Sequence, residues 1–244
     1  MGEEKREGGE LISRSAFSSP VYGGGVTPGL IRGDGGGMTP SDFLAATNVP
    51  RETFERLLAF DRVLIDWSER HNLIARSTIK DRWQRHFLDS AQLVPLLPEG
   101  GKTIVDLGSG AGFPGLVLAA MLAENATQVT LIESTQKKCA FLNEAAAAMG
   151  LKNLTVIPAR IESVGLGFTP DIVTARALAR LDKLLGYGAE IGGKNTKYFL
   201  LKGQDVAGEL TEAAKSWHMD VIRHQSRTSP DATILEIGNL ARVR

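Results

Sequence analysis

The segment Val105-Asp106-Leu107-Gly108-Ser109-Gly110-Ala111-Gly112-Phe113-Pro114-Gly115 decides the fold of this 244-residue chain. It follows a short β run, 103–106, and opens an apolar helical stretch, 113–123. Glycines between a strand and a helix allow a tight turn without an obstructing Cβ, so a ligand can approach the backbone closely. In open α/β sheets, ligands bind beyond the carboxyl ends of the strands, where this loop lies. The segment therefore predicts a nucleotide-binding α/β domain.

Short β runs alternate with helical stretches from residue 103 onward. The β runs are 103–106, 128–133, 154–157, 171–174 and 197–201, and the helical stretches are 113–123, 135–149, 180–190 and 205–217. Alternation at this spacing predicts a mainly parallel sheet with helices on both faces. Two final β runs, 220–225 and 233–240, have no helix between them, which indicates an antiparallel pair at one edge of the sheet.

The chain ahead of this domain divides into two parts. Residues 38–98 repeat apolar side chains at helical spacing and contain no strand signal, which predicts an N-terminal helical extension before a 99–244 domain. Residues 1–37 are rich in glycine, without apolar periodicity, so we expect a disordered tail and no signal peptide. Met38 is a second candidate start. The tail is thus either a gene start placed too early or an added segment, and a functional tail stays open.

Composition excludes several classes of protein. The 28 basic and 28 acidic side chains balance, which argues against a polybasic protein but permits a local basic face. One cysteine excludes a disulfide scaffold and a multi-cysteine metal centre, and we expect no metal site. The sequence contains no apolar run of the roughly 18–20 residues that a membrane-spanning helix needs, so no membrane association is expected.

The spacing of the glycine segment favours a cationic ligand. Its pattern is acid-x-Gly-x-Gly-x-Gly, which departs from the dinucleotide pattern Gly-x-Gly-x-x-Gly. The Asp106 carboxylate suits S-adenosylmethionine, which carries a sulfonium and an α-ammonium group. Glu133, at the end of the second β run, is placed to accept hydrogen bonds from ribose hydroxyls. A nicotinamide or flavin cofactor, or a glycine turn without a ligand, remains the alternative.

Residues 106–115 resemble the first motif of class I S-adenosylmethionine-dependent methyltransferases, which have a Rossmann-like fold. The ending Phe113-Pro114-Gly115 is similar to that of the glucose-inhibited division protein B family, the bacterial 16S rRNA guanine-N7 methyltransferases. Further segments resemble the same family in the same order, over about 42–244. They are Asn72-Leu73-Ile74, Arg85-His86-Phe87-Leu88-Asp89-Ser90, Glu133-Ser134 with Lys137-Lys138 and Phe141-Leu142, Thr174-Ala175-Arg176-Ala177 and Leu201-Lys202-Gly203-Gln204.

The resemblance implies a set of cofactor-binding residues, with adenine held after the third β run. These residues are Gly108, Phe113, Ile161, Glu162 and Arg176. Glu133 and Gly110, the second glycine of the loop, complete the expected cofactor-binding set. Structural roles stay open for two of them. Glu162 is also suited to a helix N-terminus, and Arg176 is also suited to a surface pair with Asp171 or Asp182.

Basic residues outnumber acidic ones between positions 69 and 86. The basic ones are Arg70, His71, Arg76, Lys80, Arg82, Arg85 and His86. Such a cluster suits phosphate contact, so Arg85 and His86 are expected to contact RNA, and Lys202 to contact a phosphate or the acceptor base. The alternatives are a solvated helix face, a core histidine beside Asp89 and a solvated lysine.

The expected chemistry needs no general acid or base, because guanine N7 has a lone pair and loses no proton. Cys139 lies inside a helical stretch, where a buried, inert thiol is expected, and this disfavours cytosine-C5 methylation. The absence of a Pro-Pro pair from the sequence disfavours adenine-N6 methylation. We expect substitution of Lys202 to impair RNA positioning more than cofactor binding.

The resemblance therefore implies a cytoplasmic, monomeric enzyme that methylates N7 of a guanine in a loop of 16S rRNA. Its partner is the small ribosomal subunit or an assembly intermediate, because a neutral domain binds naked RNA weakly. The alternative is a class I methyltransferase acting on another RNA base, a protein or a small molecule. An NAD-dependent oxidoreductase and a non-catalytic RNA-binding module are more distant alternatives.

Overall fold

The computed structural model describes residues 37–243. The predicted disordered tail therefore lies outside the described residues, apart from Gly37. Within the described range, no helix is both long and apolar enough to cross a bilayer.

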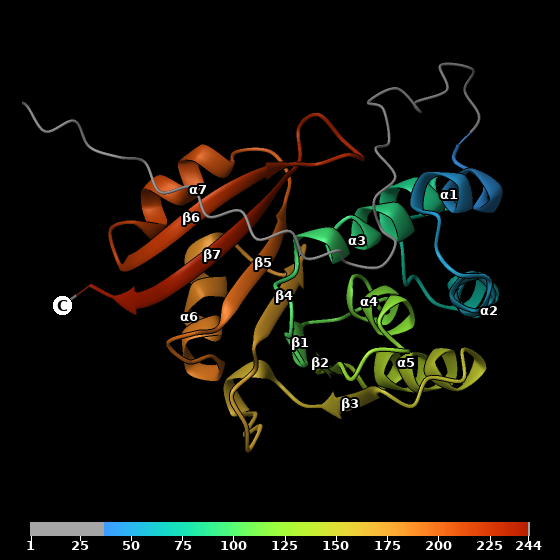
Figure 1. The fold of residues 1–244 in the computed structure, drawn as a ribbon, viewed down its shortest axis with the longest axis horizontal. Helices are drawn as coiled ribbons and strands as arrows, with labels where there is room; N and C mark the ends of the chain where they lie inside the picture. Colours follow the sequence, from blue (N-terminus) through green and yellow to red (C-terminus); the bar gives the residue numbers. More distant parts are fainter. Residues whose placement is uncertain (1–36, 244) are drawn as a thin grey trace, which may run out of the picture.

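A seven-stranded mixed sheet forms the centre of the molecule (Figure 1). Its strands are β1 (Thr103–Leu107), β2 (Gln128–Glu133), β3 (Leu154–Pro158), β4 (Ile172–Arg176), β5 (Lys197–Lys202), β6 (Trp217–Gln225) and β7 (Thr233–Arg242), in the order β3-β2-β1-β4-β5-β7-β6. Strands β1 to β5 are parallel, and β7 runs antiparallel between β5 and β6. The predicted α/β fold with an antiparallel C-terminal pair is confirmed.

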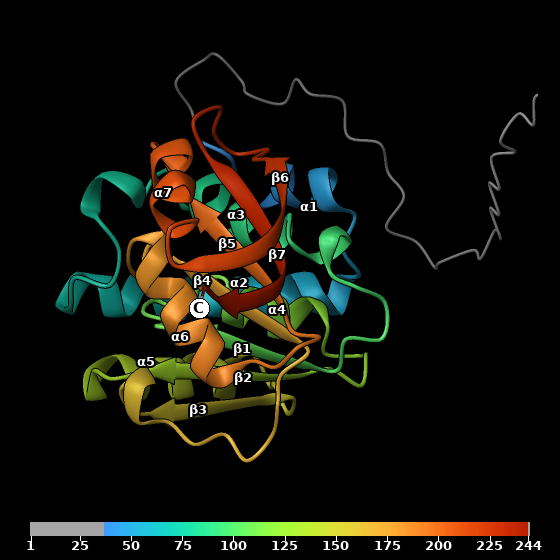
Figure 2. The same ribbon diagram turned by 90° about the vertical axis from the view of Figure 1, so that its left-hand side faces the viewer.

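Helices cover both faces of the sheet, as expected. One face carries α4 (Gly115–Met121) and α5 (Gln136–Ala148), and the other carries α6 (Leu181–Ile191) and α7 (Val206–Ala213) (Figures 1 and 2). The prediction of a helix over 205–217 was too long. Its last residue, Trp217, begins β6 and packs in the core beside α6, where its indole N–H donates to Asp182 at 2.9 Å.

The residues before β1 are helical, with no strand between Gly37 and Lys102. The segments are α1 (Pro40–Thr47), α2 (Arg51–Arg70), a 3₁₀ turn (Arg76–Thr78), a π-helix (Trp83–Leu88), α3 (Asp89–Ala91) and a 3₁₀ turn (Val94–Leu96). Thr39 caps the N-terminus of α1, because its hydroxyl accepts the Asp42 N–H while the Asp42 carboxylate accepts the Thr39 N–H.

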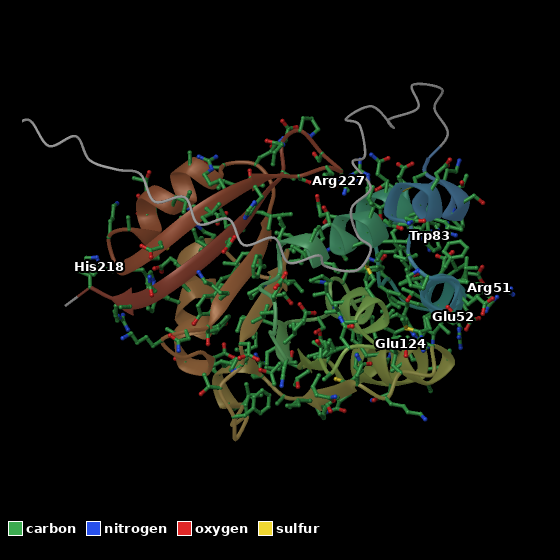
Figure 3. The ribbon with its side chains drawn as sticks, in the orientation of Figure 1. Arg51, Glu52, Trp83, Glu124, His218 and Arg227 are labelled. Carbon is green, nitrogen blue, oxygen red and sulfur yellow. The ribbon has the colours of Figure 1, made fainter. Side chains whose placement is uncertain are left out.

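An aromatic cluster joins these helices to the sheet. Trp83, labelled in Figure 3, stacks on Phe87 with ring centroids 4.2 Å apart. Phe60 of α2 contacts Phe113 at 5.0 Å and Phe141 of α5 at 6.3 Å. All five side chains are almost completely buried in one core with α4 and α5. The helical extension therefore packs against Phe113 and supports the glycine segment through this contact.

Candidate functional site

The glycine segment forms a tight loop after β1. Gly108 and Gly110 have φ angles of +63° and +57°, a region that side chains with a Cβ rarely adopt. A Cβ on Gly108 would lie 2.5 Å from Cδ1 of Leu178, so this position requires glycine for space as well. The Glu133 carboxylate accepts the backbone N–H groups of Gly110 at 3.0 Å and Thr135 at 2.7 Å. These charge-assisted hydrogen bonds fix the loop against the end of β2.

A cavity of about 540 Å³ opens beside this loop at the carboxyl edge of the sheet. We call it the cofactor cavity. It is lined by all seven residues expected to bind the cofactor, namely Gly108, Gly110, Phe113, Glu133, Ile161, Glu162 and Arg176. Residues more than 60 positions apart in the sequence thus meet around one space, of a volume typical of small-molecule sites.

Asp106 does not line this cavity, which departs from its expected place near a cationic ligand. Its side chain is completely buried on the α4 face of the sheet, where Thr174 Oγ1 donates to Oδ1 at 2.8 Å. Burial raises the pKa of Asp106 to about 6, against the opposing effect of the Thr174 hydrogen bond. The alternation of side chains along β1 explains the difference, because Asp106 points beneath the first turn of α4.

Glu162 also lines the cofactor cavity. Tyr187 of α6 donates its hydroxyl to Glu162 Oε1 at 2.7 Å, and this hydrogen bond is the main cause of a lowered pKa for the carboxyl group. Tyr187 also lines the cavity, and no sequence motif predicts this, because Tyr187 comes from α6, on the other face of the sheet from α4. Arg160 is exposed.

Arg176 ends β4 and joins the cofactor cavity to the π-helix. Its guanidinium group donates to His86 Nδ1 and to the Arg85 carbonyl, each at 3.0 Å, and lies 3.4 Å from Asp89 Oδ2. It also lies over the Phe113 ring, 5.2 Å from the centroid. The alternative of a surface pair with Asp171 or Asp182 is wrong. Asp171 accepts from Lys102 and Thr103, and Asp182 from Trp217.

His86 is uncharged at neutral pH. Arginine can only donate hydrogen bonds, so Nδ1 of His86 must be the acceptor and Nε2 carries the proton, facing Thr78 Oγ1 at 3.1 Å. Desolvation, with smaller effects from Arg176 and Arg85, lowers the pKa of His86 to about 3. Its ring stacks on Phe113 at 5.1 Å. His86 lines the cavity without adding positive charge to it.

The basic residues between 70 and 86 do not form one free cationic face. Arg82 pairs with the buried Asp61 at 2.5 Å, and Arg70 pairs with Asp66. Arg85 differs, because its side chain is 62% exposed and only loosely paired with Asp81 at 3.9 Å. Sequence reasoning could not separate these residues, since their partners lie at other helix positions.

A second cavity of about 640 Å³ brings Arg85 and His86 together with the loop between β6 and β7. Gln92 and Asp89 hold this loop, accepting the Arg227 N–H at 2.8 Å and the Thr228 hydroxyl at 2.7 Å. The exposed Arg227 stands in the same loop (Figure 3). Sequence reasoning missed it, because no motif marks a lone arginine in a hairpin loop.

Lys202, at the end of β5, is not a solvated charge. Its ammonium group pairs with Glu209 at 2.6 Å and donates to the Ala179 carbonyl at 3.0 Å. Only 10% of the side chain is exposed. Lys202 lines a third cavity, of about 250 Å³, which shares Arg176 and Ala177 with the cofactor cavity.

Cys139 is buried, as expected, and its thiol donates to the Glu133 carbonyl at 3.2 Å. Burial, followed by the charge of Glu133, raises the pKa of the thiol, which disfavours the reactive thiolate. Within residues 37–243, no group of three or more His, Cys, Asp or Glu side chains is arranged to hold a metal ion.

Comparison with known proteins gives close relatives over most of the chain. The family model GidB, described as rRNA small subunit methyltransferase G, matches residues 53–235. Proteins named ribosomal RNA small subunit methyltransferase G are similar in Parvibaculum lavamentivorans (42% identity, over 88% of this chain and 96% of the relative) and Paramagnetospirillum magneticum (45% identity, 85% and 98%). A third, from Rhodospirillum rubrum, is 45% identical over 84% of this chain and its own full length.

Solved structures resemble the fold. A ribosomal protein L11 methylase from Lactobacillus delbrueckii subsp. bulgaricus matches with a TM-score of 0.51 and 15% identity, over 62% of this chain and 76% of its own. An S-adenosylmethionine-dependent methyltransferase from Aquifex aeolicus matches with a TM-score of 0.50 and 18% identity, over 67% and 93%. At these identities the likeness shows a class I methyltransferase fold alone.

Replacing Glu133 with glutamine should weaken binding of S-adenosylmethionine about 10- to 100-fold. The amide places an N–H group against one of the two backbone donors, and a hydrogen bond to a charged group contributes about 1.5–3 kcal/mol. Isothermal titration calorimetry measures the dissociation constant. Glu144→Gln, at an exposed position on α5, is the matched control and should bind like the unchanged protein. Equal affinity of Glu133→Gln and the control would contradict this role.

His86 should make the stability of the protein sensitive to acid. Its pKa is about 3 in the folded protein and near 6.5 when unfolded, so between these values only the unfolded chain binds the proton. Stability from the neutral ring is therefore complete above pH 6.5 and is lost as the pH falls, by at most about 1.4 kcal/mol per pH unit. Urea denaturation from pH 7 to 4.5 should show a shallower loss for His86→Asn. Parallel curves would refute this.

Proposed function

This chain belongs to the GidB family of S-adenosylmethionine-dependent rRNA small subunit methyltransferases, and on that premise we propose that it methylates N7 of a guanine in a loop of 16S rRNA. The observation that supports the proposal most is the convergence of seven expected cofactor residues on one cavity that borders two further cavities. The acceptor base needs such an adjoining space.

The residues around the cofactor cavity suit S-adenosylmethionine. When bound, this cofactor supplies a methyl group on a positively charged sulfur. Glu133 already accepts the Gly110 N–H and stands beside the loop, where it suits ribose hydroxyls. Ile161 and Glu162 offer an apolar and a polar contact for adenine, and Phe113 closes the cavity toward the helical extension.

N7 of guanine accepts a methyl group through its lone pair and loses no proton. The protein therefore has to position the base and does not have to accept a proton from it. The side chains at the junction of the cavities agree with this requirement. His86 uses its free lone pair on Arg176, and the Arg176 guanidinium cannot act as a base. We therefore assign no general acid or base, and no metal ion, to the reaction.

The RNA side of the site is the cavity bordered by Arg85, His86 and the loop between β6 and β7. Arg85, which lines this cavity, and the exposed Arg227, which lies in the same β6–β7 loop beside it, suit phosphate contact. The chain as a whole has no net charge, so a folded rRNA surface in the small subunit or its precursor is the substrate rather than free RNA. In our proposal the protein acts there as a monomer, in the cytoplasm.

Mapping the modified base tests the proposal. Small ribosomal subunits from cells lacking this enzyme are incubated with the protein and S-adenosylmethionine carrying a labelled methyl group. We expect label in 16S rRNA, on one guanine, at N7, which borohydride and aniline cleavage locates. Label in ribosomal protein, or on another base, would favour the alternative of a class I methyltransferase with a different acceptor.

Replacing Arg85 with alanine should weaken binding to small subunits and make it less dependent on salt. A lost phosphate contact lowers the slope of log K against log [salt] by about 1 and affects cofactor binding little. Filter binding at several salt concentrations measures the slope. Arg51→Ala, labelled in Figure 3, removes an exposed arginine on α2 that lines none of the three cavities, and it serves as the control. An unchanged slope in Arg85→Ala would show that this arginine does not contact RNA.

A further inference from the structure

The cavity of about 250 Å³ beside the cofactor cavity contains an ion pair without a role so far. We call it the acceptor cavity. It lies at the carboxyl ends of β4 and β5 and is lined by Lys202, Glu209 of α7, Arg176 and Ala177. Arg176 and Ala177 also border the cofactor cavity, so the two spaces meet at the end of β4. The acceptor cavity lies just below the range of roughly 300–1,000 Å³ that is usual for ligand sites, and it suits a single base.

The ion pair in this cavity leaves one donor and one acceptor unused. The Lys202 ammonium group has three N–H bonds, and Glu209 Oε2 and the Ala179 carbonyl accept two of them. Glu209 Oε2 also accepts the Leu181 N–H at 2.8 Å. Within the described residues, Oε1 of Glu209 receives no donor that satisfies hydrogen-bond geometry. Only about a tenth of each side chain is exposed, so the pair is held in place.

A donor beside an acceptor matches one edge of guanine. Guanine presents the O6 acceptor next to the N1–H donor. Adenine presents the opposite order, an N6 amino donor next to the N1 acceptor. Once a bound base shields the carboxylate oxygen from water, an adenine N1 lone pair facing it would leave two acceptors unpaired, which is costly. The Lys202 donor and the Glu209 acceptor therefore each favour guanine over adenine.

Asp89 is the other carboxylate that lines the acceptor cavity, and its oxygens are already engaged. Thr228 Oγ1 and Gln92 Nε2 donate to Oδ1 at 2.7 and 2.8 Å, and Arg176 lies against Oδ2. These contacts hold the loop between β6 and β7 and the Arg176 guanidinium. Glu209 is therefore the carboxylate with an oxygen to offer to a base.

We propose that Lys202 and Glu209 together recognise the acceptor guanine, Lys202 through O6 and Glu209 through N1–H. The inference rests on the proposed function, because it presumes a guanine acceptor. Of the two roles expected for Lys202, contact with a phosphate or with the acceptor base, the proposal selects the base. Recognition of the O6–N1 edge leaves N7, on the five-membered ring, free to receive the methyl group.

Two variants test the pair on unmethylated small ribosomal subunits. Glu209→Gln and Lys202→Met should lower kcat/KM at least 10-fold, while the dissociation constant of S-adenosylmethionine changes less than twofold. Glu212→Gln removes the partner of Lys215 from an exposed pair on the same helix and should behave like the unchanged protein. Full activity of Glu209→Gln, or a loss of cofactor affinity equal to the loss of kcat/KM, would overturn the proposal.

Free nucleosides provide a readout that a purely structural role of the pair would not change. At millimolar concentration, guanosine and inosine, which both have O6 and N1–H, should inhibit methylation of the subunits. Adenosine, which lacks both groups, and 1-methylguanosine, which keeps O6 and lacks N1–H, should inhibit at least fivefold less. Glu209→Gln should lose the difference. Equal inhibition by guanosine and 1-methylguanosine, or none by either, would refute recognition of this edge.

The position of the label separates this inference from the proposed function. If the unchanged protein labels a base other than guanine, the proposed function fails, and recognition of guanine by Lys202 and Glu209 fails with it. If it labels guanine N7 and Glu209→Gln does so at the same rate, the proposed function stands and only the role of the ion pair is wrong.

Discussion

The site depends on the hydrogen bonds and the ion pair of the largely buried Arg176 guanidinium group. A cation that is largely removed from water is stable only when its donors find acceptors and a charge of opposite sign. Arg176 obtains these from the helical extension, through His86, the Arg85 carbonyl and Asp89. Its place at the end of β4 means that folding of the sheet and docking of the extension complete one network. The three cavities meet at this residue.

The π-helix Trp83–Leu88 is part of the same network. A π-helical turn is wider than an α-helical one, and the Asp89 N–H bonds back to the Gln84 carbonyl. The Arg85 carbonyl then accepts from Arg176, while Trp83 and Phe87 face the aromatic core. One short segment thus presents apolar rings to the core and polar groups to the cavity. Such turns frequently occur at functional sites.

The sequence was sufficient for the fold and for the expectation that the seven candidate cofactor residues meet around one cavity. Alternating β and α periodicity indicates a parallel sheet, and parallel strands bring their carboxyl ends, with residues such as Glu133 and Arg176, to one edge. The partners of charged residues were not predictable in the same way. Whether Arg82 faces RNA or Asp61 depends on the packing of two helices, which no local pattern encodes. The same limit applies to Tyr187 and Arg227.

The charges of the groups around the junction of the three cavities suit methyl transfer to N7. Methylation of N7 moves a positive charge from the sulfonium to the base, so a nearby uncompensated cation would oppose the transfer. Three groups of the described residues meet at the junction, and each is either compensated or neutral. Asp89 compensates Arg176, Glu209 compensates Lys202, and desolvation keeps His86 neutral, with its pKa near 3. Arg85, whose side chain is 62% exposed, lines the second cavity, where phosphate groups of a bound RNA would supply the opposite charge. A neutral whole chain is therefore compatible with RNA as substrate, because the positive charge is needed at the rim rather than at the centre.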